Sequence, residues 1–307
     1  MVALLKLIRW KNLVIILLTE VIIKYVLMDY FLREAGLSYR FNNFIFAMVA
    51  LSSIAIAAAG YIINDIRDID IDRANRPYRP LVNEKISLSS AFFLFYLFNS
   101  IGIVLSIFSA LLIGKIALFS VQFIIILLLF SYSTQLKCKK LWGNIVVSFT
   151  TAMVPLLIWL YTIYDIHNYG IMFNYPLRWM HFSVWFFILF AFLTNFIREL
   201  IKDREDRTAD ARQGCITWAG SSNLRSFKCL LSILIVITII SIGLFQYLFP
   251  AQLIFKVFLF LVQGILVFVL LPKVVFLKDS SALNGLSTLV KTAMILGVIS
   301  PVFLWLN

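Results

Sequence analysis

The sequence predicts an all-α polytopic membrane protein that crosses the bilayer about nine times. Of its 307 residues, 62% are hydrophobic and only 14% are charged, whereas soluble domains average about 45–50% and about 25%. Mean hydropathy is +0.96, and a soluble chain of this size could not bury so much apolar side chain. The composition also excludes a disordered protein, a collagen and a disulfide scaffold.

Stretches without Asp, Glu, Lys or Arg locate the expected spans, because a spanning helix needs about 20 apolar residues. Six stretches are long enough by themselves: 41–64, 86–114, 116–136, 141–164, 179–197 and 229–255. Two shorter stretches, 257–272 and 292–307, become spans if Lys256 and Lys291 extend to an interface.

The ninth span is expected at 13–32, near the N-terminus. It contains Glu20 and Lys24, which lie four residues apart and are therefore expected to neutralise each other on one helical face. Residues 1–12 are basic and aromatic and precede no cleavage site, so they predict an interfacial helix. Its apolar side chains are expected in lipid: Leu4, Leu5, Ile8 and Trp10. Its basic side chains are expected at the headgroups: Lys6, Arg9 and Lys11.

Basic residues predict the orientation. With the N-terminus in the cytoplasm, 20 of the 27 Lys and Arg residues fall in cytoplasmic segments and 5 fall outside, as the positive-inside rule requires. The net charge of +12 is therefore explained by membrane topology and anionic lipid, and no nucleic-acid partner is expected. These features predict an integral protein of the cell membrane.

The few cysteines and histidines exclude the common sites built from these residues. Cys138, Cys215 and Cys229 are scattered and all fall in predicted cytoplasmic segments, so we expect reduced thiols. His167 and His181 are the only histidines. A zinc, haem or iron–sulfur site is therefore not expected.

Acidic residues gather in two short segments. Nine of the 15 occupy two stretches that each follow an apolar span: Asp65, Asp68, Asp70 and Asp72, then Glu199, Asp203, Glu205, Asp206 and Asp210. If the helices continue, the i, i+3, i+7 spacing places three aspartates of each stretch on one face. Like charges on one face repel unless cations lie against them.

Oxygen ligands without His or Cys favour a hard cation, Mg²⁺ or Mn²⁺. Four predicted spans separate the two acidic segments, so both lie on the same side of the membrane, where they can face one cavity. Arginines and lysines alternate with the acids, as binding of a diphosphate through metal ions and cations would require. The alternative is a solvated, salt-bridged pair of loops that only flank the spans.

The motifs resemble those of the UbiA-type intramembrane prenyltransferases. N-D-I-R-D-I-D-I-D at 64–72 matches N-D-x-x-D-x-x-x-D, and R-E-L-I-K-D-R-E-D-R-T-A-D at 198–210 is similar to the second acidic motif. A third element, Tyr132 to Lys137 followed by Gly143-Asn144, also resembles the family. Ala209 replaces the usual glycine, and Thr217-Trp218 stands where many members have Thr-Leu-Pro.

The resemblance implies one prenyltransferase domain over 1–307, with nine helices around a central cavity and acidic loops at 64–85 and 198–228. It implies Mg²⁺ dependence, an isoprenyl diphosphate donor and a lipophilic acceptor in the membrane. The donor would ionise to an allylic cation, with metal ions and cationic side chains neutralising the leaving group.

Roles follow for individual residues. The metal set is Asn64, Asp65, Asp68, Asp72, Glu199, Asp203, Asp206 and Asp210. Diphosphate contacts are Arg76, Arg79, Lys137 and Lys202. The alternative for each is a basic residue that only adds to the positive charge of the cytoplasmic segments. Tyr132 and Lys137 are the catalytic candidates, and an interface-belt tyrosine is the alternative for Tyr132.

The acceptor is expected to be geranylgeranylglyceryl phosphate, with a geranylgeranyl donor. Asn75-Arg76-Pro77-Tyr78-Arg79-Pro80 resembles the N-R-P-x-R-P of the branch that makes digeranylgeranylglyceryl phosphate. Lys139 and Lys140 are then the candidates for the acceptor phosphate. Aromatic quinone precursors and chlorophyll-type acceptors are the alternatives within the family. Outside it, a divalent-cation transporter and a lipid-binding scaffold are alternatives, but transporter acids usually lie mid-membrane without neighbouring arginines.

Overall fold

The computed structural model describes residues 2–37, 41–69, 81–167, 175–212, 214–278, 283 and 285–305. Within these ranges nearly all regular structure is helical, and the one sheet is a pair of two-residue strands. The long helices are α4 (Asn43–Arg67), α6 (Leu88–Ile113), α7 (Leu118–Ser131), α8 (Trp142–His167), α9 (Tyr175–Glu205), α12 (Leu224–Leu248), α13 (Leu253–Gly264) and α15 (Leu286–Ile299).

Eight helices of the described chain are long and apolar enough to cross a membrane. Three of them continue into other helical turns: α7 into η2 (Tyr132–Leu136), α13 into η3 (Ile265–Leu270) and α14 (Leu271–Val275), and α15 into η5 (Ser300–Leu304). The predicted all-α polytopic membrane fold is thus confirmed.

The segment expected to be the ninth span is continuously helical, in the order α2 (Trp10–Val21), η1 (Ile22–Met28) and α3 (Asp29–Glu34). It is not among the eight apolar helices, because it carries Glu20, Lys24 and Asp29. The expected Glu20–Lys24 pair is wrong. Lys24 Nζ instead lies 3.2 Å from Asp29 Oδ1, and Glu20 is fully buried beside Ser53.

The N-terminal helix is shorter than the one expected over residues 1–12. It is α1 (Val2–Leu7), and the chain turns at Arg9, whose φ of 49° is left-handed, before α2 begins at Trp10. Leu7 packs with Ile62 and Ile66 near the end of α4. The turn brings the Arg9 side chain toward that same end, where its Nη2 lies 2.9 Å from Asp65 Oδ1.

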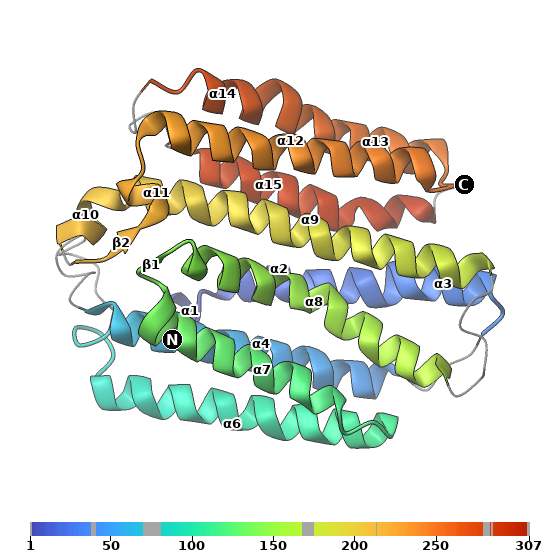
Figure 1. Ribbon diagram of the computed structural model, residues 1–307. Coiled ribbons are helices and arrows are strands. Elements are labelled where there is room, and N and C mark those ends of the chain that lie inside the picture. Colours follow the sequence, from blue (N-terminus) through green and yellow to red (C-terminus); the bar gives the residue numbers. More distant parts are fainter. Residues whose placement is uncertain are drawn as a thin grey trace.

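The core is built around α9, which lies between α8 and α15 (Figure 1). Phe186 of α9 stacks on Phe245 of α12 with ring centroids 4.0 Å apart. A Cβ on Gly297 of α15 would lie 2.3 Å from the ring of Phe190, so the close approach of α15 to α9 requires glycine. These contacts fix the helix that carries the second acidic segment.

Both acidic segments lie at one end of the bundle, where the helices stop. Regular α4 ends at Arg67, and α9 ends at Glu205, before a bend at Asp206 and the short α10 (Arg207–Arg212). The expected single helical face from Asp203 to Asp210 is therefore interrupted. Strand β1 (Lys139–Lys140), strand β2 (Ile216–Thr217) and α11 (Trp218–Ser221) lie at the same end (Figure 1).

Candidate active site

One cavity of about 830 Å³ opens among the helices at this end. Side chains from both acidic segments line it: Asn64, Asp65, Asp68, Glu199, Asp203, Asp206 and Asp210. Lys137, Lys202 and Tyr132 line it as well. The structure thus brings together, from segments more than 130 residues apart in the sequence, most of the side chains that the motifs singled out.

The cavity changes from charged to apolar along its length. On α4 its lining runs from Asp68 back to Ser53, which is roughly 22 Å of helix at about 1.5 Å per residue. Away from the charged end the lining is mainly apolar: Ile15, Ile16, Ile56, Ile125, Leu129, Val147, Val154 and Leu157. Such a cavity accommodates a molecule with an anionic head and a hydrocarbon tail.

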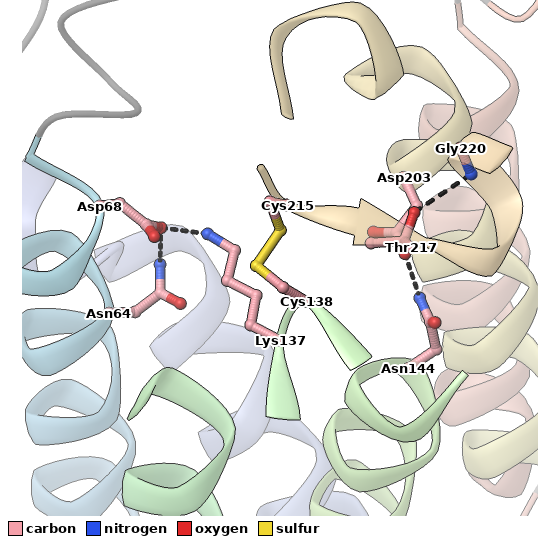
Figure 2. The surroundings of a disulfide bond; sticks show 9 residues. All are labelled: Asn64, Asp68, Lys137, Cys138, Asn144, Asp203, Cys215, Thr217 and Gly220. Atoms are coloured by element: carbon pink, nitrogen blue, oxygen red, sulfur yellow. Dashed lines mark hydrogen bonds and ion pairs between the residues drawn. A yellow bond between two sulfur atoms is a disulfide. The ribbon is translucent and has the colours of Figure 1, made fainter. Parts of the chain in front are cut away.

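Asp65 and Asp68 lie in the last turn of α4 and each has a basic partner. Asp68 accepts a hydrogen bond from Asn64 Nδ2 at 2.7 Å and another from the ammonium of Lys137 (Figure 2). Asp65 Oδ1 lies 2.9 Å from Arg9 Nη2. Of the first motif and its tail, Asp72, Arg76 and Arg79 lie outside the described residues.

Lys137 is positioned by the turn that follows η2. Its backbone N–H donates to the carbonyl of Tyr132 at 3.0 Å. A Cβ on Gly143 would lie 3.0 Å from the carbonyl oxygens of Leu136 and Lys137, so a side chain there would crowd the turn against which α8 begins. The next residue, Asn144, donates from Nδ2 to Asp203 Oδ2 at 2.9 Å (Figure 2). The short Gly143-Asn144 element therefore connects Lys137 to the second acidic segment.

On α9, one carboxylate is shared by two cations. Glu199 Oε1 accepts from Arg198 Nη1 at 2.6 Å and from Lys202 Nζ at 3.3 Å. Asp206 is exposed at the bend, and Asp210 lies on α10. Arg204 has a structural role, because its Nη1 donates to the carbonyls of Ala219 and Ser222.

A disulfide bond joins Cys138 to Cys215, with Cα atoms 4.8 Å apart. The bond precedes the parallel pairing of β1 with β2, in which Lys139 pairs with Ile216, and it links the turn carrying Lys137 to the chain after Asp210 (Figure 2). The expectation that all three cysteines are reduced is therefore wrong. Cys229 remains a free thiol and is exposed.

The disulfide is expected to stabilise the end of the bundle that carries the acidic segments. It closes a separation of 77 residues, and bonds that close long loops contribute typically about 2–4 kcal/mol. Replacing both Cys138 and Cys215 by Ser should lower the thermal stability in detergent. A reducing agent should lower the stability of the wild type in the same way and should have no further effect on the double variant. Cys229→Ser is the matched control. Equal destabilisation of the wild type and the double variant by the reducing agent would contradict this role.

The donor set suits a hard divalent cation, but the carboxylates are not gathered around one point. In the described part of the chain no three His, Cys, Asp or Glu side chains are close enough to hold a metal ion. Asp203, Asp206 and Asp210 nevertheless face the cavity that Asp68 lines. The buried Asn144 Oδ1 has no hydrogen-bond partner among the described residues, so a further neutral oxygen ligand is available beside Asp203.

The acidic side chains of the cavity influence one another. Burial raises the pKa of Asp210 to about 6; the ammonium of Lys137 opposes this rise, and the carboxylates of Asp206 and Asp68 add to it. Part of this rise therefore comes from repulsion between carboxylates, which a bound cation would relieve.

Magnesium affinity is therefore expected to depend on pH. A metal ion binds the ionised carboxylate, so protons compete with it below the raised pKa of Asp210, about 6. Competition at Asp210 alone should lower the apparent affinity about tenfold per pH unit below that pKa. Titration calorimetry with Mg²⁺ from pH 5 to 8 checks this. In Asp210→Asn, the plot of the logarithm of Mg²⁺ affinity against pH should lose the slope that one proton contributes. An unchanged slope would contradict the assignment of Asp210 as a metal ligand.

Several cavity residues were not singled out by the sequence. Arg9, Tyr61, Asn195, Arg198 and Lys291 all line the cavity. The sequence marks Arg198 only as the first residue of the second motif, with no role of its own, Arg9 only as a basic residue of the N-terminal helix, and Lys291 only as a charge that interrupts the last span. The i, i+3 and i+4 spacing of Asn195, Arg198 and Glu199 is the pattern that could have predicted that these three residues share one helical face.

Two predicted site residues are elsewhere. Lys139 and Lys140 form β1, are exposed, and are not part of the cavity lining. The structure does not bring them to the cavity that holds the acidic side chains.

Comparison with known proteins identifies similar sequences. A model of the UbiA prenyltransferase family matches residues 26–298. A digeranylgeranylglyceryl phosphate synthase from Sulfurisphaera tokodaii is 30% identical over 227 residues, which is 74% of this chain and 74% of that protein. One of the same name from Saccharolobus solfataricus is 33% identical over 188 residues, or 60% of this chain and 59% of that protein.

Solved structures have the same fold. A structure described as concerning digeranylgeranylglyceryl phosphate synthase in membranes has a TM-score of 0.71 at 21% identity, covering 98% of this chain and 97% of that one. A UbiA homolog from Archaeoglobus fulgidus bound to GPP and Mg²⁺ has a TM-score of 0.61 at 15% identity, covering 97% and 99%.

Proposed function

The chain belongs to the UbiA prenyltransferase family, and from this premise we propose that it transfers a geranylgeranyl group from its diphosphate to geranylgeranylglyceryl phosphate. It is an integral membrane enzyme that transfers prenyl groups. The observation that carries the proposal is that one cavity has acidic and basic groups at one end and an apolar lining beyond. The acceptor rests on the N-R-P-x-R-P-like segment and on the names of the relatives.

The carboxylates of both segments would hold Mg²⁺, or Mn²⁺ in its place. The set comprises Asp68, Asp203, Asp206 and Asp210 with Asn64, Asp65 and Glu199 around them, and Asp72 from the remainder of the first motif. Bound Mg²⁺ supplies positive charge that makes the diphosphate a better leaving group.

The cationic side chains hold and stabilise the departing diphosphate. Lys137 and Lys202 line the cavity, and we assign Arg76 and Arg79 to the same task. The Lys137 ammonium now pairs with Asp68, and it would be available to phosphate oxygens if that carboxylate held a metal ion. The allylic C–O bond breaks with its electron pair leaving on pyrophosphate. The acceptor hydroxyl attacks the allylic cation, and its proton passes to the departing pyrophosphate as the ether bond forms.

Two further features protect the cation. Tyr132 lines the cavity, as Lys137 does, and we assign its ring the role of stabilising the positive charge. The apolar lining excludes water, which would otherwise hydrolyse the cation. Residues 1–307 are proposed to act as one such domain.

We place the charged end of the bundle in the cytoplasm, with the protein in the cell membrane and its N-terminus inside. The support is the 20 of 27 basic residues assigned to that side. An impermeant thiol reagent should label Asp206→Cys only after cells are opened, and labelling in intact cells would reverse the orientation.

Mass spectrometry of the products tests the proposed reaction. Purified protein with Mg²⁺ and geranylgeranyl diphosphate is offered geranylgeranylglyceryl phosphate, 4-hydroxybenzoate and a dihydroxynaphthoate. The ether lipid should be the product formed. Prenylation of an aromatic acid alone would overturn the acceptor and leave prenyl transfer standing, whereas no product with any acceptor would favour a cation transporter or a lipid-binding scaffold.

A further inference from the structure

A basic part of the cavity wall lies on three helices beside the acidic side chains. We define the basic wall as Asn195 and Arg198 on α9, Lys291 on α15 and Asn12 on α2, all of which line the cavity. Lys291 Nζ donates to Asn12 Oδ1 at 2.9 Å. Its contact is therefore a neutral amide, which orients the ammonium without neutralising its charge.

Two donors of the basic wall have no acceptor in the described chain. Arg198 Nε and Asn195 Nδ2 are both buried and have no hydrogen-bond partner there, and Asn195 is only 5% exposed. The two residues are three positions apart on α9 and so share a face. Buried donors are normally paired, so unpaired donors in a cavity wall indicate acceptor atoms supplied by a ligand.

The electrostatic surroundings of Lys291 are positive. The charged groups that act on it are Arg198, Lys202 and Lys11. The carboxylate of Glu199 is already shared by Arg198 and Lys202. The basic wall therefore keeps an excess of positive charge in a partly buried place. An anion can bind there without a metal ion, in contrast to the aspartates, which need one.

We propose that the basic wall binds the phosphate monoester of the lipid acceptor directly and without metal. This inference rests on the proposed function and refines it, because it assigns the acceptor phosphate to Lys291, Arg198 and Asn195 instead of the exposed Lys139 and Lys140. Donor diphosphate and acceptor phosphate then occupy neighbouring subsites with different chemistry. The two anions do not compete for the same cations, and both hydrocarbon chains extend into the apolar part of the cavity.

Binding in the absence of Mg²⁺ tests the proposal without requiring turnover. The full chain in detergent with EDTA is titrated calorimetrically with geranylgeranylglyceryl phosphate and, separately, with neutral geranylgeranylglycerol. Wild type should bind the phosphate lipid more tightly than the neutral one. Lys291→Met should weaken only the phosphate lipid, by about 10- to 100-fold, as expected for loss of one charge-assisted contact.

Control variants separate charge from packing. Lys291→Arg should restore most of the affinity, and Lys256→Met, which removes a lysine of α13 outside the cavity lining, should bind as wild type does. In turnover assays Lys291→Met should raise the KM of the acceptor at least tenfold and that of the donor less than threefold.

Several outcomes would contradict binding of the acceptor phosphate to the basic wall. The proposal falls if the phosphate lipid needs Mg²⁺ to bind, if Lys291→Met binds it as wild type does, or if the loss appears only in Lys139→Met/Lys140→Met. Metal-free, Lys291-dependent binding of the phosphate lipid in a protein that transfers nothing to it would uphold the subsite and overturn the proposed function. If Lys291→Met weakens the Mg²⁺-dependent binding of geranylgeranyl diphosphate as much as it weakens binding of the phosphate lipid, Lys291 belongs to the donor site and the proposal is wrong.

Discussion

Replacing Asp203 by Asn is expected to lower kcat about 10²–10³-fold at saturating Mg²⁺, the loss seen when one preorganised electrostatic group is removed from an active site. Asp203 is held by Asn144 Nδ2 at 2.9 Å, so its carboxylate is fixed toward the cavity. The substitution keeps the shape of the side chain but removes the charge that a cation requires. Pyrophosphate release from geranylgeranyl diphosphate with acceptor measures the effect.

A neighbouring acid provides the control for Asp203. Glu205 lies two residues further along α9 and is not part of the cavity lining. Glu205→Gln should keep kcat within about threefold of wild type, and thermal unfolding should find both variants folded. A small effect of Asp203→Asn, or an equal effect of Glu205→Gln, would remove the second acidic segment from the mechanism.

Replacing Lys137 by Met is expected to lower kcat/KM for the donor about 100-fold. One charge-assisted contact to phosphate is worth about 1.5–3 kcal/mol, which is roughly 10- to 100-fold, and the contact strengthens as charge develops on the leaving group. Both a higher donor KM and a lower kcat are therefore expected. Steady-state kinetics at several donor concentrations separates them.

The control for Lys137 is an exposed lysine outside the cavity lining. Lys278 follows α14 and is exposed, so Lys278→Met should leave both constants unchanged. If Lys137→Met changes acceptor KM alone, the ammonium belongs to the acceptor and the assignment to the diphosphate is wrong.

The sequence was most informative where a local pattern has a physical meaning. Charge-free stretches of about 20 residues located six of the eight apolar helices, because the bilayer fixes their length, and two shorter stretches located the other two. The acidic segments could be assigned to one end because each follows a span. Asp65 and Asp68 lie on one face of α4, as their spacing required.

Contacts between distant segments were beyond such patterns. The Arg9–Asp65 pair spans 56 residues and depends on the left-handed turn at Arg9, which no side-chain pattern marks. The Cys138–Cys215 bond follows from the parallel register of β1 and β2, and strands of two residues have no periodicity to detect. Lys291 illustrates a third reason: a charge in an apolar span can extend to an interface or face a cavity, and only helix packing decides between these.

The central claim is that both acidic segments hold cations of one donor site. Anomalous diffraction from crystals grown with Mn²⁺ and a non-hydrolysable thiolo analogue of geranylgeranyl diphosphate tests it most directly. Manganese peaks are expected in the cavity between Asp68 on one side and Asp203 and Asp210 on the other, with phosphorus beside them and the Lys137 ammonium turned to the diphosphate. Manganese at only one segment, or outside the cavity while the analogue is bound within it, would contradict the account.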